Sequence, residues 1–432
     1  MANTPNEKTT LTLKARTALL CGGLLFGLLL AEIGLRVVGF SSPSFYTTDP
    51  DLGWITRPGA AGWQRAEGEA YVRINSEGFR DREHSVPKPP GTLRVAVVGD
   101  SFTTAIQVPV EVRFTSVMEN RLSMCPALGG KKVEVFNFGV GGYGTAQELL
   151  TLRTRVWKYS PDIVVLCFCT GNDVRNNYRT LNEDPSLKEG SGAGINSCPY
   201  FVYKGDKLVL DNSFRSSPRF QPRAVWLHDL EADILNKFRM LQLVNNISNL
   251  ATWRAQQRAA QKRLSNPARL EKVFGAGNDQ TLKNIEAVDE GELGLDNLVY
   301  YPPTTEAWKE AWRVTEGLLV MTRDEVRDHG AQFLLMIGST GRQVNPDLAV
   351  RKTFMKSLGV DTLLYPDTRL QAFAEKENIP VVALAPIFAA YTEQHHVSVH
   401  GFKNSRGGHW NELGHRLAGE IVASRICDSM IH

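Results

Sequence analysis

Five short apolar runs, set among helical patterns, constrain the fold of this chain more than any other feature. They read LRVAVVG, VEVFNFG, DIVVLCFCTG, AQFLLMIGS and IPVVALAP, from residue 93 to residue 386. The third run is apolar on both faces, which is typical of a buried parallel strand. Helical patterns follow the first two runs and precede the last two. This alternation predicts an α/β fold with a parallel sheet covered by helices.

A strongly apolar segment lies near the N-terminus. Residues 17–31 carry no charge, and the segment continues to residue 40, which is long enough to span a bilayer. Three basic residues precede it and fewer follow closely, so residues 1–16 are expected in the cytoplasm and the rest outside. We expect an uncleaved transmembrane anchor over 17–40. The alternatives are a cleaved signal peptide and a buried core helix.

The remaining chain divides by composition. Residues 41–90 are rich in turn formers and predict an irregular lead-in. Residues 91–432 form the α/β domain, interrupted at about 179–300 by an insertion. Within it, a charged, Gln-rich helical pattern runs from about 227 to 264. The insertion could be a lid or a partner-binding surface, although its individual charges suit a solvated helix equally well, and we favour that interpretation.

Charge and cysteine content exclude several classes of protein. The net charge is only +3 and no basic stripe is present, which argues against nucleic acid as a partner. The six cysteines include no C-x-x-C pair, so a zinc ribbon or thioredoxin-type site is not expected. Outside the cytoplasm, one disulfide could form among Cys125, Cys198 and Cys427, in any pairing. The sequence predicts no particular oligomeric state.

The first apolar run ends in Gly99-Asp100-Ser101. In open α/β sheets, ligands bind at the carboxyl ends of the strands. A serine there begins a helix, where backbone N–H groups can stabilise the oxyanion formed when its oxygen attacks a carbonyl. A plain Ser or Asp helix cap has the same pattern. The triplet alone therefore leaves Ser101 either a cap or a nucleophile.

The next two runs also end in unusual turns. Residues 137–145 read NFGVGGYGT, and their glycines would let backbone approach a ligand closely. Their spacing does not match a dinucleotide-binding loop. After the third run, Asn172 offers a side-chain amide, which can serve an oxyanion hole or simply form an Asx turn.

His409 lies in a loop before the last helical pattern. From there it could reach the same edge of the sheet and act as a general base, or it could be a surface histidine. Five of the nine histidines fall between 395 and 415, which raises the question of a metal site. There is no H-E-x-x-H and no regular ligand spacing, so we expect no metal.

Taken together and in this order, the four motifs resemble the SGNH hydrolase superfamily, also called the GDSL esterase/lipase family. Its four blocks carry Ser, Gly, Asn and His, matched here by Ser101, Gly142, Asn172 and His409. The resemblance covers roughly residues 93–178 and 315–427. It implies a flavodoxin-like three-layer α/β/α fold with a five-stranded parallel sheet. The apolar segment and the lead-in resemble those of membrane-anchored bacterial members.

This resemblance assigns roles to the matched residues. Ser101 would be the nucleophile and His409 the base. The oxyanion hole would comprise the N–H groups of Ser101 and Gly142 with the amide of Asn172. The acids beside the motifs, Asp100 and Asp173, would support the site structurally.

The chain departs from the family at the acid that orients the histidine. Family members place an Asp two or three residues before it, where this sequence has Gly407 and Arg406. Three interpretations remain open. A backbone carbonyl could hold His409 in a Ser–His dyad, a carboxylate from elsewhere could substitute, or the site could be weak or inactive. We favour the dyad.

The expected function is ester hydrolysis without a cofactor. The substrate would be an acylated small molecule, glycan or lipid of the cell envelope, reached by an anchored extracytoplasmic domain. The same residues would make an O-acetyltransferase of an extracellular polysaccharide if a sugar hydroxyl replaced water. A non-catalytic binding protein on the same scaffold is the alternative from a different class.

Overall fold

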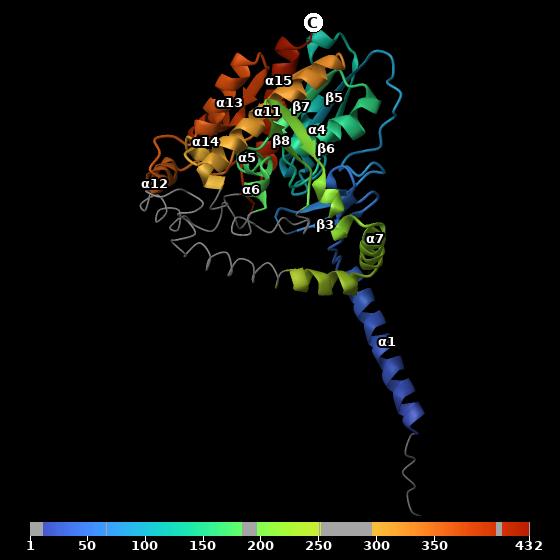
Figure 1. The fold of residues 1–432 in the computed structure, drawn as a ribbon. Helices are drawn as coiled ribbons and strands as arrows, with labels where there is room; N and C mark the ends of the chain where they lie inside the picture. The colour runs from blue at the N-terminus through green and yellow to red at the C-terminus, as the bar shows by residue number, and fades with distance from the viewer. Residues whose placement is uncertain are drawn as a thin grey trace, which may run out of the picture.

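The architecture is built around one parallel sheet (Figure 1). The structure, a computed structural model, describes residues 12–65, 67–183, 197–249, 251, 296–402 and 408–431. The sheet order is β11-β10-β7-β5-β6, and every neighbouring pair is parallel. Its strands are β5 (Thr92–Gly99), β6 (Lys132–Gly139), β7 (Ile163–Phe168), β10 (Gln332–Ile337) and β11 (Val381–Ala383). The five strands predicted from the apolar runs are confirmed.

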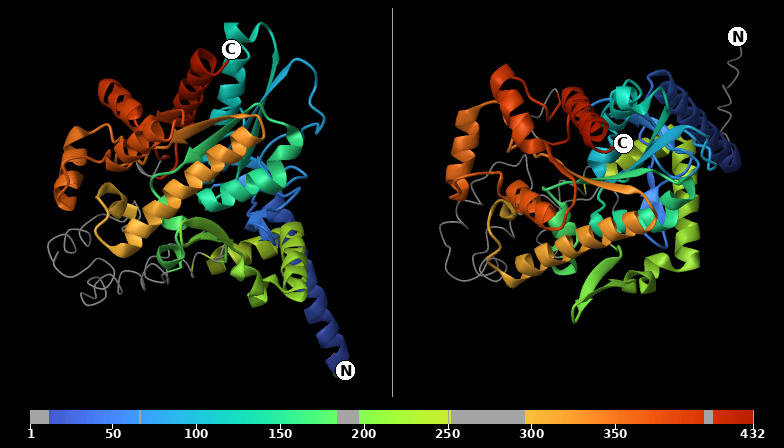
Figure 2. Two further views of the ribbon diagram at one scale, coloured as in Figure 1. Left: turned by 45° about the horizontal axis from the view of Figure 1, so that its top comes forward. Right: turned by 90° about the horizontal axis from the view of Figure 1, so that it is seen from above.

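Helices cover both faces of this sheet, giving three layers (Figure 2). Successive residues of a strand point to opposite faces, so Val97 and Val98 enter two different cores. One core is completed by α3 (Phe114–Leu122), α14 (Leu384–His395) and α15 (Glu412–Ser429). The other is completed by α4 (Thr145–Thr151), α11 (Glu306–Asp328), α12 (Leu348–Leu358) and α13 (Tyr365–Lys376). The fold is the three-layer α/β/α arrangement that the resemblance implied.

The strand order fixes where a ligand site belongs. The chain runs from β5 outward to β6 and then returns to the other side of β5 to form β7. Loops leaving the carboxyl ends of β5 and β7 therefore diverge, and such a switch point opens a crevice. Ser101 follows β5 and Asn172 follows β7.

The lead-in over 41–90 is more ordered than its composition predicts. It forms two antiparallel hairpins. Their strands are β1 (Tyr46–Asp49), β2 (Gly53–Thr56), β3 (Ala61–Gln64) and β4 (Ala70–Arg73). Leu52, Trp54 and Phe79 are buried in the core that α4, α11, α12 and α13 complete. The buried Arg80 donates to the carbonyls of Ala105 and Val108, so it satisfies backbone groups just after the short helix that begins at Ser101.

The apolar N-terminal segment forms α1 (Leu13–Val37), which extends away from the folded domain (Figure 1). It begins and ends a few residues earlier than the expected 17–40. It is long and apolar enough to cross a membrane, and its most apolar stretch is not buried in the protein. Its 25 residues rise about 37 Å, against about 30 Å for a bilayer core.

The insertion begins after α5 (Asp173–Asn176) and contains a short helix, a hairpin and a longer helix. These are α6 (Arg179–Asn182), β8 (Tyr200–Lys204), β9 (Lys207–Asp211) and α7 (Pro222–Lys237). A further helix covers residues 239–249. The helix expected from 227 to 264 thus starts earlier and is interrupted at Phe238, whose backbone is extended. The remainder of that expectation lies outside the described residues.

Short helical turns complete the described backbone. They are α2 (Ser101–Thr104), η1 (Pro126–Leu128), η2 (Leu152–Val156), η3 (Trp157–Tyr159), η4 (Ser213–Ser216), η5 (Pro218–Phe220) and η6 (Asp296–Tyr300). The helix that begins as α4 continues through η2 and η3 to Tyr159.

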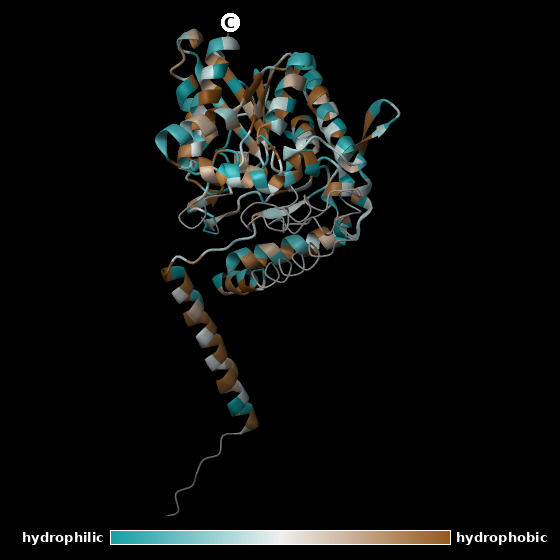
Figure 3. Ribbon diagram, turned by 90° about the vertical axis from the view of Figure 1, so that its left-hand side faces the viewer, coloured by the Kyte–Doolittle hydropathy of each residue, from teal (hydrophilic) through white to brown (hydrophobic). Residues whose placement is uncertain are grey.

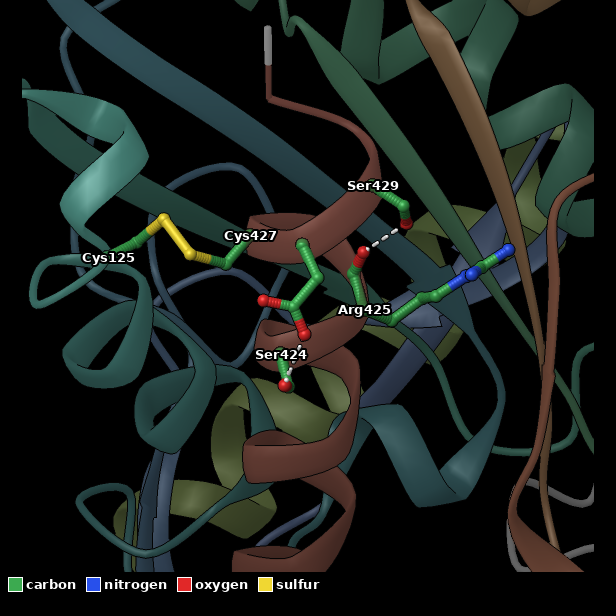
Figure 4. The surroundings of a disulfide bond; sticks show 6 residues. Cys125, Ser424, Arg425, Cys427 and Ser429 are labelled. Atoms are coloured by element: carbon green, nitrogen blue, oxygen red, sulfur yellow. Dashed lines mark hydrogen bonds between the residues drawn. A yellow bond between two sulfur atoms is a disulfide. The ribbon is translucent and has the colours of Figure 1, made fainter.

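A disulfide joins Cys125 to Cys427 (Figure 4). Of the pairings left open by the sequence, this is the one formed, and Cys198 is a buried free thiol. The bond ties the turn after α3 to the end of α15. These two helices pack side by side. It therefore stabilises the helix that follows His409.

Candidate active site

Ser101 begins α2 directly after β5. Asp100 caps this helix, because its carboxylate accepts from the backbone N–H of Phe102 at 2.9 Å. Burial raises the pKa of Asp100, although the hydrogen bond from Phe102 and the nearby His409 partly offset that effect. The turn thus fixes Ser101 at the carboxyl edge of the sheet, with Asp100 beneath it.

His409 reaches Ser101 from the loop before α15. Its Nε2 lies 2.8 Å from Ser101 Oγ. Backbone bonds on both sides hold the loop: Gly401 donates to the His409 carbonyl at 2.9 Å, and Asn411 donates to Val399 at 3.0 Å. The two groups predicted to act together are therefore within hydrogen-bonding distance.

Glu67, from the lead-in, contacts the other side of His409. One carboxylate oxygen lies 2.6 Å from Nδ1, and the other accepts from the His409 backbone N–H at 2.7 Å. The side chains of Glu67 and His409 are 27% and 25% exposed, so they line an accessible site. Burial raises the pKa of Glu67, but the bonds to His409 outweigh it and hold that pKa below its usual value.

Two glycines permit this contact. Gly408 has a φ of +92°, and a Cβ there would lie 2.3 Å from the Glu67 carboxylate. Gly68 has a φ of +70°, and a Cβ there would lie 2.2 Å from the Gln107 carbonyl. A residue larger than glycine at either position would displace the acid or the turn that carries it.

A second histidine supports the loop from beneath. His400 is fully buried, and its Nδ1 lies 2.7 Å from the Gly408 carbonyl. Its Nε2 lies 2.9 Å from the hydroxyl of Ser339, and that hydroxyl oxygen accepts from Trp410 Nε1 at 3.1 Å. Burial lowers the pKa of His400 to about 4, so this ring is neutral near pH 7 and donates to the carbonyl through Nδ1.

The glycine-rich turn after β6 is fixed by hydrogen bonds with Trp54 of the lead-in. Trp54 Nε1 donates to the Gly141 carbonyl at 3.0 Å, and Tyr143 donates to the Trp54 carbonyl at 2.5 Å. Gly142 has a φ of +82°. Because a trans peptide directs its C=O and N–H to opposite sides, the bond from Trp54 also sets the direction of the Gly142 N–H.

Tyr46, on β1, places its hydroxyl beside the same turn. A Cβ on Gly141 would approach this hydroxyl to 2.5 Å and lie 3.8 Å from Ser101 Cβ. Burial and the nearby Asp100 raise the pKa of Tyr46 to about 12. The phenol therefore stays protonated at neutral pH and can donate a hydrogen bond near Ser101.

Asn172 and Asp173 follow β7. The Asn172 amide lies 3.3 Å from Asp100, which directs its donor group toward the turn after β5. Asp173 is fully buried and accepts from the backbone N–H of Cys169 at 2.7 Å. It therefore fixes the turn that presents Asn172.

A further buried carboxyl group lies behind these turns. Glu148, on α4, is fully buried, and within the described ranges no hydrogen-bond partner reaches either of its carboxylate oxygens. Burial and, secondarily, the charge of Asp100 raise its pKa well above the usual value. A protonated, neutral Glu148 is the form compatible with these surroundings.

The acid was the part of the site missed by the sequence analysis. Of the three interpretations left open, the favoured one, a backbone carbonyl, is wrong. A carboxylate from elsewhere in the chain, that of Glu67, occupies that position. Arg406 and Gly407, the positions where the resemblance implied an acid, lie outside the described residues. In the sequence, Glu67 is marked only by the glycine that follows it, Gly68. An acidic residue next to a glycine is too common a pattern to indicate a catalytic acid.

Comparisons with known proteins find similarity only among solved structures. No protein-family model matches the chain, and no curated protein matches its sequence. An acetyl xylan esterase is 13% identical, with 78% of this chain and 100% of that chain covered and a TM-score of 0.33. A catalytic mutant of an acetylxylan esterase from Geobacillus stearothermophilus is 10% identical, with coverage of 78% and 94% and a TM-score of 0.34.

A GDSL-like lipase from Bacteroides thetaiotaomicron is 10% identical, with coverage of 79% and 91% and a TM-score of 0.31. These values are too low to transfer an activity or a residue role. Esterases and lipases are thus among the solved structures to which this chain is similar, and one of them is described as GDSL-like.

Proposed function

We propose that this chain is a serine esterase in which Ser101 is the nucleophile, His409 the general base and Glu67 the acid that orients the base. The observation that carries the proposal is the continuous chain of contacts from Ser101 Oγ through His409 to Glu67, at 2.8 and 2.6 Å. A nucleophile, a base and an orienting group in hydrogen-bonding contact are the arrangement that activates a serine.

Each contact has a chemical role in the proposed reaction. Glu67 accepts the Nδ1 proton of His409, which leaves Nε2 free to accept the proton of Ser101. The serine oxygen attacks the ester carbonyl and forms a tetrahedral intermediate. The backbone N–H groups of Ser101 and Gly142 and the amide of Asn172 stabilise the oxyanion.

The intermediate then collapses in two stages. His409 returns the proton to the leaving alcohol, and the acyl group remains on Ser101 as an ester. Water, deprotonated by His409, attacks this acyl-enzyme, and a second collapse releases the carboxylic acid and restores Ser101. The reaction requires no cofactor.

The position of the site suggests the class of substrate. In this proposal α1 anchors the chain, with the residues that precede α1 in the cytoplasm and the folded domain outside. The Cys125–Cys427 disulfide supports that orientation, since such bonds persist in oxidising compartments. The substrate is then an acylated glycan or lipid of the cell envelope.

The proposal is tested with the full-length chain in detergent. Hydrolysis of p-nitrophenyl acetate and labelling by a fluorophosphonate are measured for the wild type, Ser101→Ala and His409→Ala. Ser123→Ala, which removes an exposed serine near the end of α3, is the matched control. We expect both activities in the wild type and control only. A folded wild type that neither hydrolyses the ester nor reacts with the probe would overturn the proposal.

A further inference from the structure

The two helices beside the end of α1 expose apolar residues along one side. On α7, Trp226, Leu227, Leu230 and Ile234 recur at helical spacing and are all exposed, with Trp226 at 61%. The helix over 239–249 continues the pattern. Its exposed residues include Leu241, Val244 and Ile247, the last two at 60%, and Phe238 between the helices is also exposed.

Two polar residues of α7, Asp229 and Asn236, face the protein instead. Asp229 accepts from Thr47 at 2.6 Å and pairs with Arg57 at 3.1 Å. Asn236 exchanges two hydrogen bonds with the backbone of Ser44. A helix on the surface of a soluble protein normally buries its apolar face and exposes its polar face. On α7 this arrangement is inverted.

The following helix docks in the same way. The side chain of Gln242 is fully buried, accepts from the Ser42 N–H at 2.9 Å and donates to the Asn236 carbonyl at 3.0 Å. Its polar side therefore contacts the lead-in, while its apolar side faces outward. Figure 3 shows brown hydrophobic residues on these helices at the foot of the domain, where α1 leaves it.

Direct hydrogen bonds fix the level of these helices relative to α1. The Glu32 carboxylate accepts from the backbone N–H groups of Arg239 and Met240, at 3.0 and 2.9 Å. Arg36 donates to the Lys237 carbonyl at 2.7 Å. Glu32 lies five residues, or about 7.5 Å of helix rise, before the end of α1 at Val37.

We propose that α7 and the helix over 239–249 bind the surface of the membrane that α1 crosses, with their apolar sides in the boundary between headgroups and acyl chains. Amphipathic helices lie in this position, with the apolar face buried about 5–10 Å. The inference rests on the proposed anchoring role of α1. The hydrogen bonds to Glu32 favour a lipid surface over a protein partner. They place the exposed apolar residues of the two helices, here called the exposed stripe, level with the last turns of the membrane-spanning helix.

The ends of the stripe on α7 suit an anionic lipid surface. Arg223 and Lys237 fall on the same helical side as Leu227, Leu230 and Ile234 and are exposed. Basic residues beside a buried apolar face bind anionic headgroups.

This surface also connects the membrane to the proposed site. α7 holds Ser44, Thr47 and Arg57, which lie on either side of Tyr46 and Trp54 in the lead-in. Binding of the helices at the membrane would therefore fix the height of the site above the bilayer. A substrate held in the same membrane would then meet Ser101 at a constant distance.

The experiment measures contact with lipid residue by residue. The full-length chain is labelled with an environment-sensitive fluorophore through single cysteines and reconstituted into vesicles. The vesicles contain anionic phospholipid with or without bromine atoms on the acyl chains, since bromine quenches a nearby fluorophore. The native Cys21, exposed on α1, reports on the anchor. For other positions, Cys21→Ala removes it, and the buried thiols and the disulfide stay unlabelled.

Leu230→Cys tests the proposed surface. Two matched controls are also exposed: Glu231→Cys, the next residue on the same helix, and Gln371→Cys on α13, far from α1 (Figure 1). We expect brominated lipid to quench the labels at Cys21 and Leu230→Cys by about twofold or more, Glu231→Cys less and Gln371→Cys not at all.

The outcomes separate the two proposals. Quenching at Cys21 without quenching at Leu230→Cys would overturn the membrane-binding surface and leave the anchor standing. If the protein in that case forms a defined oligomer, the exposed stripe is a contact between copies. Absence of quenching at Cys21 would overturn the anchor and, with it, this inference.

Discussion

Glu67 binds His409 with both carboxylate oxygens, one on the imidazole and one on the backbone N–H, across a sequence separation of 342 residues. The lead-in thus supplies the residue that the loop before His409 does not. Two consequences follow for the chemistry. The contact with Nδ1 holds the imidazole in one tautomer. The hydrogen bond from the backbone N–H of His409 to Glu67 also holds the loop that carries the imidazole.

Replacing the acid should impair turnover strongly. We expect Glu67→Gln to lower kcat by about 10²–10⁴, because an amide cannot stabilise the imidazolium and can favour the wrong tautomer. Glu67→Asp should lose less, since it keeps the charge but shortens the reach. Glu69→Gln, at an exposed neighbouring position, should match the wild type. Ester hydrolysis by the full-length chain measures this, and equal rates for Glu67→Gln and Glu69→Gln would contradict the assignment.

A methyl group at Gly408 should have the same effect by displacement. In Gly408→Ala the new carbon would meet the Glu67 carboxylate at 2.3 Å, so the acid must move away from His409. Gly359→Ala is the matched control, because Gly359 also has a positive φ, of +71°, but no atom within 4 Å of its added carbon. Both variants should lose roughly 1–2 kcal/mol of stability to backbone strain. Only Gly408→Ala should lose activity, and intact kcat in that variant would contradict the expected displacement of Glu67 from His409.

Trp54 should act as a positioning residue for the oxyanion. Trp54→Phe removes the hydrogen bond to the Gly141 carbonyl and leaves the Gly142 N–H free to turn. We expect kcat to fall, by less than the about 10²–10³ that loss of an oxyanion donor itself costs, with little change in KM. Trp63→Phe, on β3 of the same lead-in, is the control. A rise in KM with unchanged kcat would assign Trp54 to substrate binding instead.

Glu148 should make stability dependent on pH. Its pKa is raised in the folded protein, so folding takes up a proton at any pH between the usual value of about 4.3 and the raised one. The free energy of unfolding therefore falls as pH rises through that window. Glu148→Gln removes this dependence, so its Tm relative to wild type should increase from pH 4 to pH 8. Glu375→Gln, exposed on α13, should show a constant difference, and a constant difference for Glu148→Gln would contradict the prediction.

The disulfide should contribute to stability but not to chemistry. Cys427→Ser breaks the bond to Cys125 and should lower the free energy of unfolding by about 2–5 kcal/mol, while ester hydrolysis at low temperature persists. Cys21→Ser, which removes an exposed thiol on α1, is the control. Equal melting temperatures of the two variants would contradict a stabilising role.

The fold was predictable because its signal is local. Each strand of the sheet is a short apolar run, and residues such as Val95 to Val98 carry that signal without reference to the rest of the chain. The placement of Ser101 and Asn172 at strand ends follows from the same pattern. The placement of His409 at the same edge of the sheet required only that α15, the helix that follows it, pack beside α3.

The acid and the lead-in were not predictable for the opposite reason. Glu67 sits in a short polar turn between β3 and β4, and nothing in its neighbours distinguishes it from Glu69. Its role depends on the position of Gly408 in space, which no sequence period encodes. The hairpins of the lead-in are equally short, and turn-forming residues between their strands suggested an irregular segment. The inverted amphipathicity of α7 became visible only when Asp229 and Asn236 were seen to face the protein.

The central claim is that Glu67, His409 and Ser101 act as one unit, and a double-mutant cycle tests it most directly. The kcat for ester hydrolysis is measured for the wild type, Glu67→Gln, His409→Ala and the double variant, all as full-length protein. If Glu67 acts through His409, the double variant should be no slower than His409→Ala alone. If the two losses multiply, Glu67 acts independently of the base, and the proposed triad is wrong.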